Sequence, residues 1–287
     1  MSKLIKFNDN LNIKDTIHHS FKPNSMFRTK VIAGHDLKKD KNGVSQLGEV
    51  LFEKENMTVL GGALFTLGKV FGAEPPITID YLNTFMNIAN DGVPINESFP
   101  KENVVCLFGI GIGGCGDSLT SVKDVKIYER EIFDMIPFRI TDEPLLAEEQ
   151  DKYWFRQLRE DGKTAYYLKK FEADPEIKVL WKDSENDEDG TEVENGVHNT
   201  TRTEPIESFV EIILNINKKD VREFFELNGN IEMSRVNSLG LFTGIQGTLA
   251  DNSIDYKQVQ LFSKLNFYNE MLNLAKDLTF IYRIYAS

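Results

Sequence analysis

The feature that most limits the fold is a series of β-patterned runs in the middle of the chain. Residues 164–171 (TAYYLKKF) and 177–181 (IKVLW) are rich in branched and aromatic side chains, and the turn pair Asp174-Pro175 lies between them. Such runs are typical of strands, so the segment 164–181 is predicted to form two antiparallel strands joined by a short loop. The side chains expected on one face of the first strand are Ala165, Tyr167, Lys169 and Phe171.

Further runs of this kind extend the β prediction to other parts of the chain. The expected strands are residues 104–108, 122–128, 207–216 and 279–285. In 207–216 both sets of alternate residues are largely apolar, which indicates a strand that is covered on both faces and lies inside a sheet. These strands are paired through turns, so the sequence predicts an α+β fold, mostly antiparallel sheet with several short helices.

Helices are expected mainly in the first third of the chain. One helical face is formed by the apolar residues Leu60, Leu64, Leu67 and Phe71. Gly61, Gly62 and Gly68 fall inside this helix, and they are plausible where another backbone approaches closely. Shorter helices are predicted at 80–89, at 218–227 with Asn217 as N-cap and Asn228-Gly229 at the end, and at 269–276.

Charge divides the chain unevenly. Residues 1–41 hold nine basic and four acidic side chains, a net of +5, and the remainder carries −17. A basic N-terminal arm, or a partly ordered leader, is therefore predicted for 1–41, and a single α+β body for 42–287 with a possible helical subregion at 42–100. An arm could lie on the acidic surface of a neighbouring copy.

Composition excludes several classes of protein. A net charge of −12 argues against general coating of nucleic acid, and 41% hydrophobic residues indicate a packed globular protein. Cys106 and Cys115 are the two cysteines, which favours a reducing compartment. The N-terminus lacks the apolar stretch of a secretory signal, and the longest nonpolar stretch, 59–68, is too short to cross a membrane.

The sharpest match to a functional pattern is the glycine run at residues 109–114 (GIGIGG), which follows a predicted strand. The pattern G-x-G-x-x-G binds a pyrophosphate when a helix begins at its last glycine. Here Cys115 and Gly116 follow Gly114, and the next patterned stretch reads as a strand. The run is better explained as a glycine loop, a bulged strand end or a close contact between subunits. A nucleotide-binding enzyme built on Gly109 to Gly114 remains the alternative from another functional class.

Residues 183–196 hold seven acidic side chains in fourteen residues, which invites a calcium interpretation. With Gly190 at the sixth position of a calcium loop, the twelfth position is Gly196, where a bidentate glutamate is required. A solvated acidic loop that binds cations weakly at most is the preferred interpretation. The residues that would fill the first, third and fifth positions are Glu185, Asp187 and Asp189.

No other constellation carries chemistry. Neither C-x-x-C nor H-E-x-x-H nor G-x-S-x-G occurs, and residues 235–244 are explained by a packed strand or turn. The sequence therefore predicts no catalytic, cofactor-binding or metal-binding residue, no cofactor and no enzymatic activity. The histidines, which form no ligand set, are His18, His19, His35 and His198.

Several segments resemble a family of structural proteins from the virions of large tailed bacteriophages, encoded among head and neck components. The segments that carry the resemblance are LGGALFTL at 60–67, DMIPFR at 134–139, YWFR at 153–156, AYYLKKF at 165–171, DPE at 174–176, RVN at 235–237 and the stretch 265–285. Together they span most of the chain, although none is a signature with a mechanism of its own. The acidic run 183–196 has no counterpart in this resemblance.

The resemblance implies a subunit of a symmetric neck or head–tail connector ring, six- or twelvefold, that joins capsid and tail and lets DNA pass. It implies contacts with copies of itself and with portal, tail or neck proteins, no sequence-specific binding of DNA and no contact with a membrane. The expected location is the virion, after assembly in the host cytoplasm. Another tail or baseplate subunit is the alternative within the same class. An acidic composition suits a lumen that must not bind passing phosphate.

Overall fold

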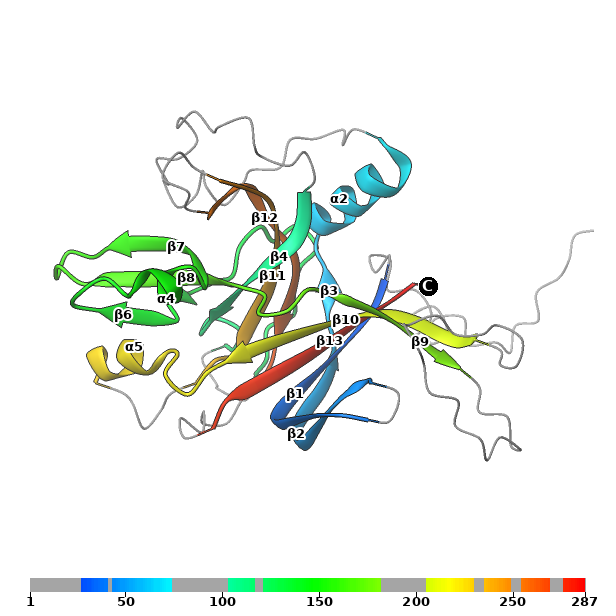
Figure 1. Cartoon of the computed structure of the whole chain (residues 1–287), viewed down its shortest axis with the longest axis horizontal. Helices are drawn as coiled ribbons and strands as arrows, with labels where there is room; N and C mark the ends of the chain where they lie inside the picture. The colour runs from blue at the N-terminus through cyan, green and yellow to red at the C-terminus, as the bar shows by residue number, and fades with distance from the viewer. Residues whose placement is uncertain are drawn as a thin grey trace, which may run out of the picture.

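The computed structural model describes residues 27–40, 43–73, 103–116, 121–181, 205–229, 235–248, 254–268 and 276–286. Its strands form two antiparallel sheets that pack face to face (Figure 1). Sheet A has five strands in the order β2-β1-β13-β10-β9, and sheet B has eight, with β3-β12-β11-β4-β8-β6 in line, β5 beside β4 and β7 beside β8. The predicted fold class, mostly antiparallel sheet with few short helices, is confirmed.

The strands of sheet A are β1 (Phe27–Lys39), β2 (Ser45–Glu55), β9 (Glu176–Trp181), β10 (Pro205–Ile216) and β13 (Leu278–Ala286). The strands of sheet B are β3 (Met57–Thr58), β4 (Asn103–Gly111), β5 (Met135–Ile136), β6 (Arg139–Thr141), β7 (Tyr153–Leu158), β8 (Thr164–Lys170), β11 (Ser238–Thr248) and β12 (Ile254–Asn266). The helices are α2 (Leu60–Phe71), α4 (Ala147–Gln150) and α5 (Arg222–Leu227).

The main core lies between the two sheets. Alternate residues of β10 and β13, such as Leu214 and Phe280, are buried against Phe108 of β4 and Leu241 of β11. Because one face of each strand is removed from water, each large side chain contributes roughly 1.5–3 kcal/mol of burial energy. A second cluster, with Leu107, Leu168 and Phe242 at its centre, covers the opposite face of sheet B. As predicted, β10 lies inside its sheet, between β13 and β9.

The prediction of a hairpin over 164–181 is wrong in its pairing, although both strands are present. β8 belongs to sheet B and β9 to sheet A, so the segment between them crosses from one sheet to the other. β8 instead forms its hairpin with β7, through a turn that includes Gly162 at φ 81°. β9 pairs with β10. Alternation of apolar and polar residues marks a segment as a strand, but it does not determine which strand lies beside it.

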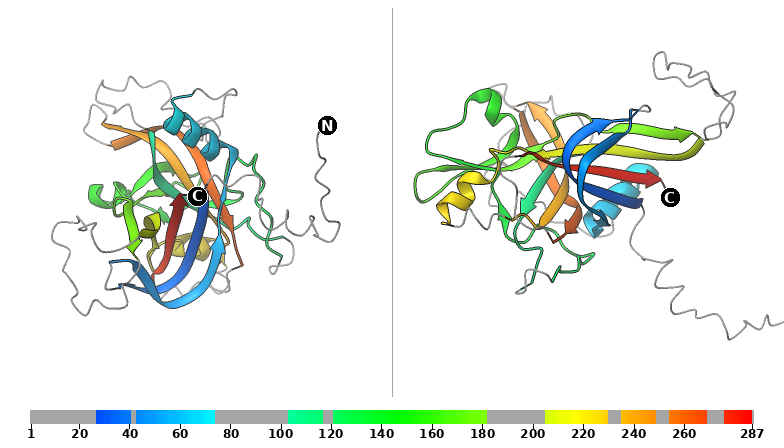
Figure 2. Two further views of the ribbon diagram at one scale, coloured as in Figure 1. Left: turned by 90° about the vertical axis from the view of Figure 1, so that its right-hand side faces the viewer. Right: turned by 90° about the horizontal axis from the view of Figure 1, so that it is seen from below.

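The N-terminal strand is part of the body of the protein. Residues 27–39, grouped by charge with the basic segment 1–41, form β1 between β2 and β13 in sheet A. The views in Figure 2 show β1, β2 and β13 side by side in blue, lighter blue and red. Residues 1–26 lie outside the described residues. Within the predicted helical subregion 42–100, residues 45–55 and 57–58 are strands, 60–71 are helical, and 74–100 lie outside the described residues.

The ends of β1 and β2 fold back over the outer face of sheet A as a hairpin, residues 35–49, here called the outer hairpin (Figure 1). The strands turn sharply where Asp36 has φ 60° and where a Cβ on Gly34 would lie 1.9 Å from the backbone oxygen of Glu49. Only glycine allows the two backbones to approach so closely at this corner. At the tip, Val44 is buried against Phe209 and Tyr285.

Helix α2 is present as predicted, but its buried face differs from the predicted one. Leu67 and Phe71 are 39% and 72% exposed, whereas Gly61, Gly62 and Thr66 are buried. A Cβ on Gly62 would lie 2.1 Å from the backbone oxygen of Phe262, so the glycine lets α2 lie directly on β12. The close backbone approach expected at these glycines is therefore found at Gly62.

Two other local predictions are corrected. Residues 122–128 form no strand beyond a single bridge between Val122 and Cys115, and the segment is a loop whose Val125 packs against the second cluster. Asn217 does not cap a helix: α5 begins later, after Val221, and Asn217 N–H donates to Asp220. The helix predicted at 80–89, and all but the last residue of that at 269–276, lie outside the described residues.

Candidate functional site

The glycine run is built into the protein core. Gly109 and Gly111 belong to β4; a Cβ on Gly109 would lie 2.8 Å from the side chain of Leu168, and a Cβ on Gly111 would lie 2.6 Å from that of Ile132. A Cβ on Gly114 would lie 1.9 Å from the backbone oxygen of Asn237. These glycines are therefore required because strand β4 and the following residues pack closely against other parts of the chain.

Two amide groups at the end of the run donate to oxygens inside the protein. Gly114 N–H donates to Asn237 Oδ1 at 2.7 Å, and Ile112 N–H donates to the Asp134 oxygen at 3.0 Å. After Gly114 the described residues form an isolated bridge between Cys115 and Val122 and no helix. Within the described residues the run is followed by no helix N-terminus, and the amides of Ile112 and Gly114 already have partners, which favours the bulged strand end over the dinucleotide fingerprint.

The other residues considered from the sequence as functional candidates are either buried in the protein or lie outside the described residues. Burial raises the pKa of the Cys106 thiol to about 12, and burial likewise raises the pKa of Cys115, so neither thiol is activated as a nucleophile. His35 is buried, with Nδ1 2.7 Å from the backbone oxygen of Asp277. Among the described residues, no group of three or more His, Cys, Asp or Glu is placed to hold a metal ion. The candidates outside the described residues are the acidic run 183–196, His18, His19 and His198.

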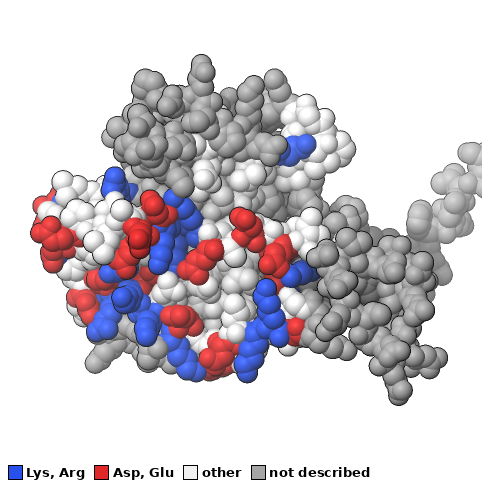
Figure 3. All heavy atoms as spheres, in the orientation of Figure 1, with Lys and Arg blue, Asp and Glu red and all other residues white. Residues whose placement is uncertain are grey.

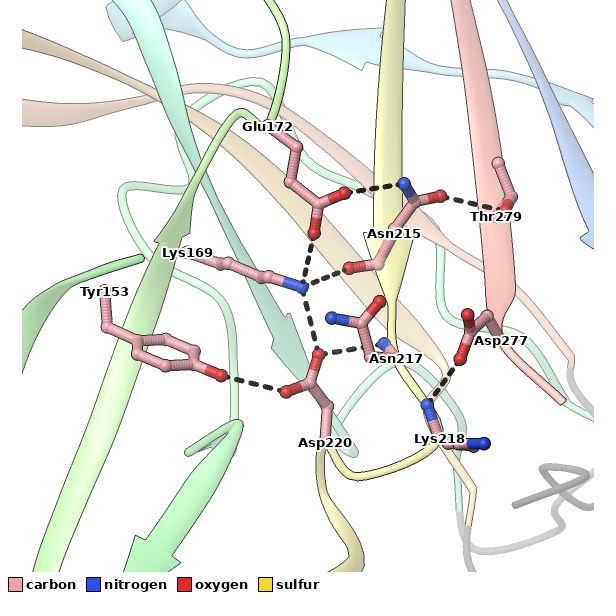
Figure 4. A network of polar contacts seen from close by, with 9 residues as sticks. All are labelled: Tyr153, Lys169, Glu172, Asn215, Asn217, Lys218, Asp220, Asp277 and Thr279. Carbon is pink, nitrogen blue, oxygen red and sulfur yellow. Dashed lines mark hydrogen bonds and ion pairs between the residues drawn. The ribbon is translucent and has the colours of Figure 1, made fainter. Parts of the chain in front are cut away.

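The most elaborate polar arrangement among the described residues surrounds Lys169 of β8 (Figure 4). Its side chain is fully buried, and Nζ lies 3.1 Å from Asp220 Oδ2 and 3.0 Å from Glu172 Oε1. Nζ also donates to the backbone oxygen of Asn215 at 2.8 Å. Three oxygen partners match the three N–H bonds of an ammonium group, so its charge is fully compensated. We call this group, together with Tyr153 and Thr279, the lysine network.

The lysine network connects the two sheets. Tyr153 O–H of β7 donates to Asp220 Oδ1 at 3.0 Å, and burial together with the Asp220 charge raises the pKa of this tyrosine. On the other side, Asn215 of β10 donates from Nδ2 to Glu172 at 2.8 Å and accepts from Thr279 of β13 at 2.9 Å. A continuous chain of side-chain hydrogen bonds and ion pairs thus connects sheet B to sheet A.

This network is not predictable from the sequence pattern because the alternation of β8 is broken. Leu168 has φ 52°, and the consecutive residues Tyr167 and Leu168 both pack in the second cluster. Lys169 is therefore turned away from the face it would share with Tyr167 in a regular strand and points toward sheet A. The only local signal is a lysine within an apolar run; its partner Asp220 is 51 residues away in sequence.

The charge state of Glu172 gives the lysine network a pH dependence. Partial burial on its own would raise the pKa of Glu172, but the hydrogen bond from Asn215 and the charge of Lys169 outweigh it and hold the pKa below its ordinary value of 4.5. A lowered pKa stabilises the fold at pH values above 4.5, and this stabilisation is lost as the pH falls through the native pKa.

We therefore expect Glu172→Gln to be less stable than the wild type at neutral pH and the difference to shrink in acid. Urea unfolding of both proteins between about pH 6 and about pH 3 measures this difference. Glu160→Gln, at an exposed position in the turn after β7, is the matched control and should show no such convergence. A constant gap between Glu172→Gln and wild type across this range would contradict the assignment.

Two further buried ion pairs fix loops onto the sheets. Glu211 of β10 lies 3.3 Å from Arg283 of β13 and accepts a hydrogen bond from Ser45 N–H of the outer hairpin at 3.2 Å. On sheet B, Lys264 Nζ lies 2.7 Å from Glu129 and 4.0 Å from the centre of the Phe133 ring. The first pair holds the outer hairpin on sheet A, and the second holds the loop that covers sheet B.

Among the described strands, sheet A has two open edges, which form the candidate assembly surface. Among the described strands β2 pairs only with β1, and β9 only with β10. Val50 and Leu51 on the first edge are 55% and 45% exposed, and Ile177 and Val179 on the second are 78% and 37% exposed. An unpaired strand with exposed aliphatic side chains is a template for another strand. The two edges are residues 50–55 of β2 and strand β9.

The charged residues give no single-sign surface on the face shown in Figure 3, where acidic and basic side chains are interspersed. Among the described residues several charged side chains are paired with each other, for example Lys276 with Glu49 at 3.0 Å. The apolar edges are therefore more distinctive than the charge on this face. No described helix is long and apolar enough to cross a membrane. No protein-family model, no curated protein and no solved structure matches the chain.

Proposed function

We propose that this chain is a structural subunit of a tailed bacteriophage virion, one that works by associating with copies of itself and with neighbouring virion proteins. The observation that carries the proposal is the pair of open, aliphatic edges on opposite sides of sheet A. A subunit with two different binding edges associates head to tail, and a head-to-tail contact that closes gives a ring. This agrees with the sequence resemblance to head and neck proteins.

The buried polar groups support a mechanical role. The lysine network and the Glu211–Arg283 pair use their charges to join strands and loops. A buried charge that loses its partner is costly, so such pairs resist separation of the elements that they connect. A ring that transmits force between capsid and tail needs subunits whose two sheets do not separate.

The finer proposal is a neck or head–tail connector ring of six or twelve copies through which DNA passes. Quantitative mass spectrometry of particles purified from the virus that carries the gene should give a copy number that is a multiple of six. Electron microscopy of the same particles should show density at the neck that fits the two packed sheets of this subunit. Absence of the chain from purified particles would overturn the proposal, and density in the tail or baseplate would move the subunit there.

A further inference from the structure

We propose that copies of this chain join edge to edge, with residues 50–55 of β2 in one copy hydrogen-bonded to β9 of the next, so that sheet A continues from subunit to subunit. The proposal rests on the proposed function as an assembly subunit and specifies the interface that such a subunit would use. The partner is therefore a second copy of the same chain.

The two edges match in length and in chemistry. The part of β2 after the outer hairpin, residues 50–55, has the same six-residue length as β9. On its outer side each edge has no neighbouring strand among the described strands, so the backbone N–H and C=O groups there belong to no strand ladder. Pairing would add a strand ladder at each edge and remove from water the exposed parts of Val50, Leu51, Ile177 and Val179.

The faces of sheet A are already covered, which leaves its edges for association. The inner face packs on sheet B, where Phe280 and Leu214 contribute to the main core. The outer face carries the outer hairpin, held by Val44 and by the bonds of Ser45 to Glu211 and Arg283. A second copy can therefore extend sheet A sideways without displacing either layer.

Strand direction favours a head-to-tail contact. Antiparallel pairings connect all five strands of sheet A, so β2 and β9 run in the same direction. A copy related by rotation about an axis along the strands places its β9 parallel to β2 and leaves one β2 and one β9 open at the two ends. The sheet can then grow until the ring closes.

Charge disfavours the two-fold alternative, in which β2 pairs with β2 of another copy. Residues 50–55 carry two glutamates and one lysine, so two such strands would bring an excess of negative charge together. β9 carries one glutamate and one lysine. Pairing of β2 with β9 therefore avoids the repulsion that a β2 dimer would have.

The first test measures self-association of the full chain by sedimentation velocity and native mass spectrometry. Ile177→Lys and Val50→Lys each place a charge in the proposed interface, and we expect each to weaken association about tenfold or more. The matched control is Leu158→Lys, a 73% exposed leucine at the end of β7 in sheet B, which should associate like the wild type. Equal association of all four proteins, or a wild type that stays monomeric at the highest concentration reached, would overturn the proposal.

The second test determines which edges meet. The Val50→Cys and Ile177→Cys proteins are each treated with a short bismaleimide, first separately and then as a mixture. Wild type treated in the same way measures the background of cross-linking through the native Cys106 and Cys115. Cross-linked dimers are expected in the mixture, and neither variant alone should exceed the wild-type background. Cross-linking of Val50→Cys alone would show a two-fold β2 contact and overturn the head-to-tail arrangement. No cross-link in the mixture would overturn the interface.

The outcomes separate this interface from the proposed function. If the chain is present in particles and Ile177→Lys does not affect their assembly, the proposed virion role stands and the proposed β2–β9 contact fails. If the chain is absent from particles but forms oligomers that both lysine substitutions weaken, the proposed β2–β9 contact stands and the proposed virion role fails.

Discussion

Replacing Lys169 with methionine is expected to lower the free energy of unfolding by about 3–5 kcal/mol, the usual result of breaking a buried ion pair by removing one partner. The substitution keeps much of the side-chain volume, but it leaves the buried Asp220 carboxylate without its cation. Urea denaturation followed by tryptophan fluorescence and circular dichroism measures the change. If Lys169→Met does not fold, Asp220→Asn, which retains a polar group beside Lys169, provides a milder form of the same test.

The control for this prediction is Arg222→Met. Arg222 pairs with Glu226 across one turn of α5 on the protein surface, where ion pairs contribute little. Its midpoint of denaturation should match the wild type. The double variant Lys169→Met with Asp220→Asn should cost less than the two single changes added together, because the two residues share one interaction. Additive losses, or a Lys169→Met protein as stable as the control, would show that the ion pair is not a major source of stability.

The second large effect is expected for Gly114→Ala, which should destabilise the protein by about 1–3 kcal/mol or more through overpacking. The new methyl group would lie 1.9 Å from the backbone oxygen of Asn237, and backbone cannot move aside as a flexible side chain can. The shift would also disturb the hydrogen bond from Gly114 N–H to Asn237 Oδ1. Thermal and urea unfolding measure the loss.

Gly116→Ala is the matched control, because a Cβ at Gly116 would have its nearest neighbours in ordinary contact at 3.7 Å. Its stability should stay within about 0.5 kcal/mol of the wild type. The comparison also tests the interpretation of Gly114 as a position of close packing. Equal stability of the two variants would contradict the close packing described for β4 and the residues after it.

The individual strands were more predictable than their arrangement. Residues 207–216 and 279–285 carry enough apolar residues to mark them as strands, and both are strands of sheet A. The hairpin predicted over 164–181 failed because the preference of β8 for β7 and of β9 for β10 depends on packing between the sheets. Period-two alternation reports which residues are extended, whereas partner choice depends on contacts between distant segments.

The candidate site shows the same division. The glycines of residues 109–114 could be recognised as positions of close approach, but the partner Asn237 could not, because it follows more than a hundred residues later. Lys169 reads as one residue of a strand face until the backbone of Leu168 is known. For β1, the basic charge of the leading segment suggested an arm, while its apolar residues, including Val31 and Ala33, place it in the core.

The position of β13 has a consequence for biosynthesis. It is the middle strand of sheet A and follows every other described strand along the chain, so β1 and β10 each wait for it as their neighbour. While the ribosome is still translating the residues before 278, neither strand has this partner, and sheet A cannot be completed. Until then β1 and β10 each expose an edge that β13 covers in the folded chain, so nascent chains are more open to cross-association than the finished subunit.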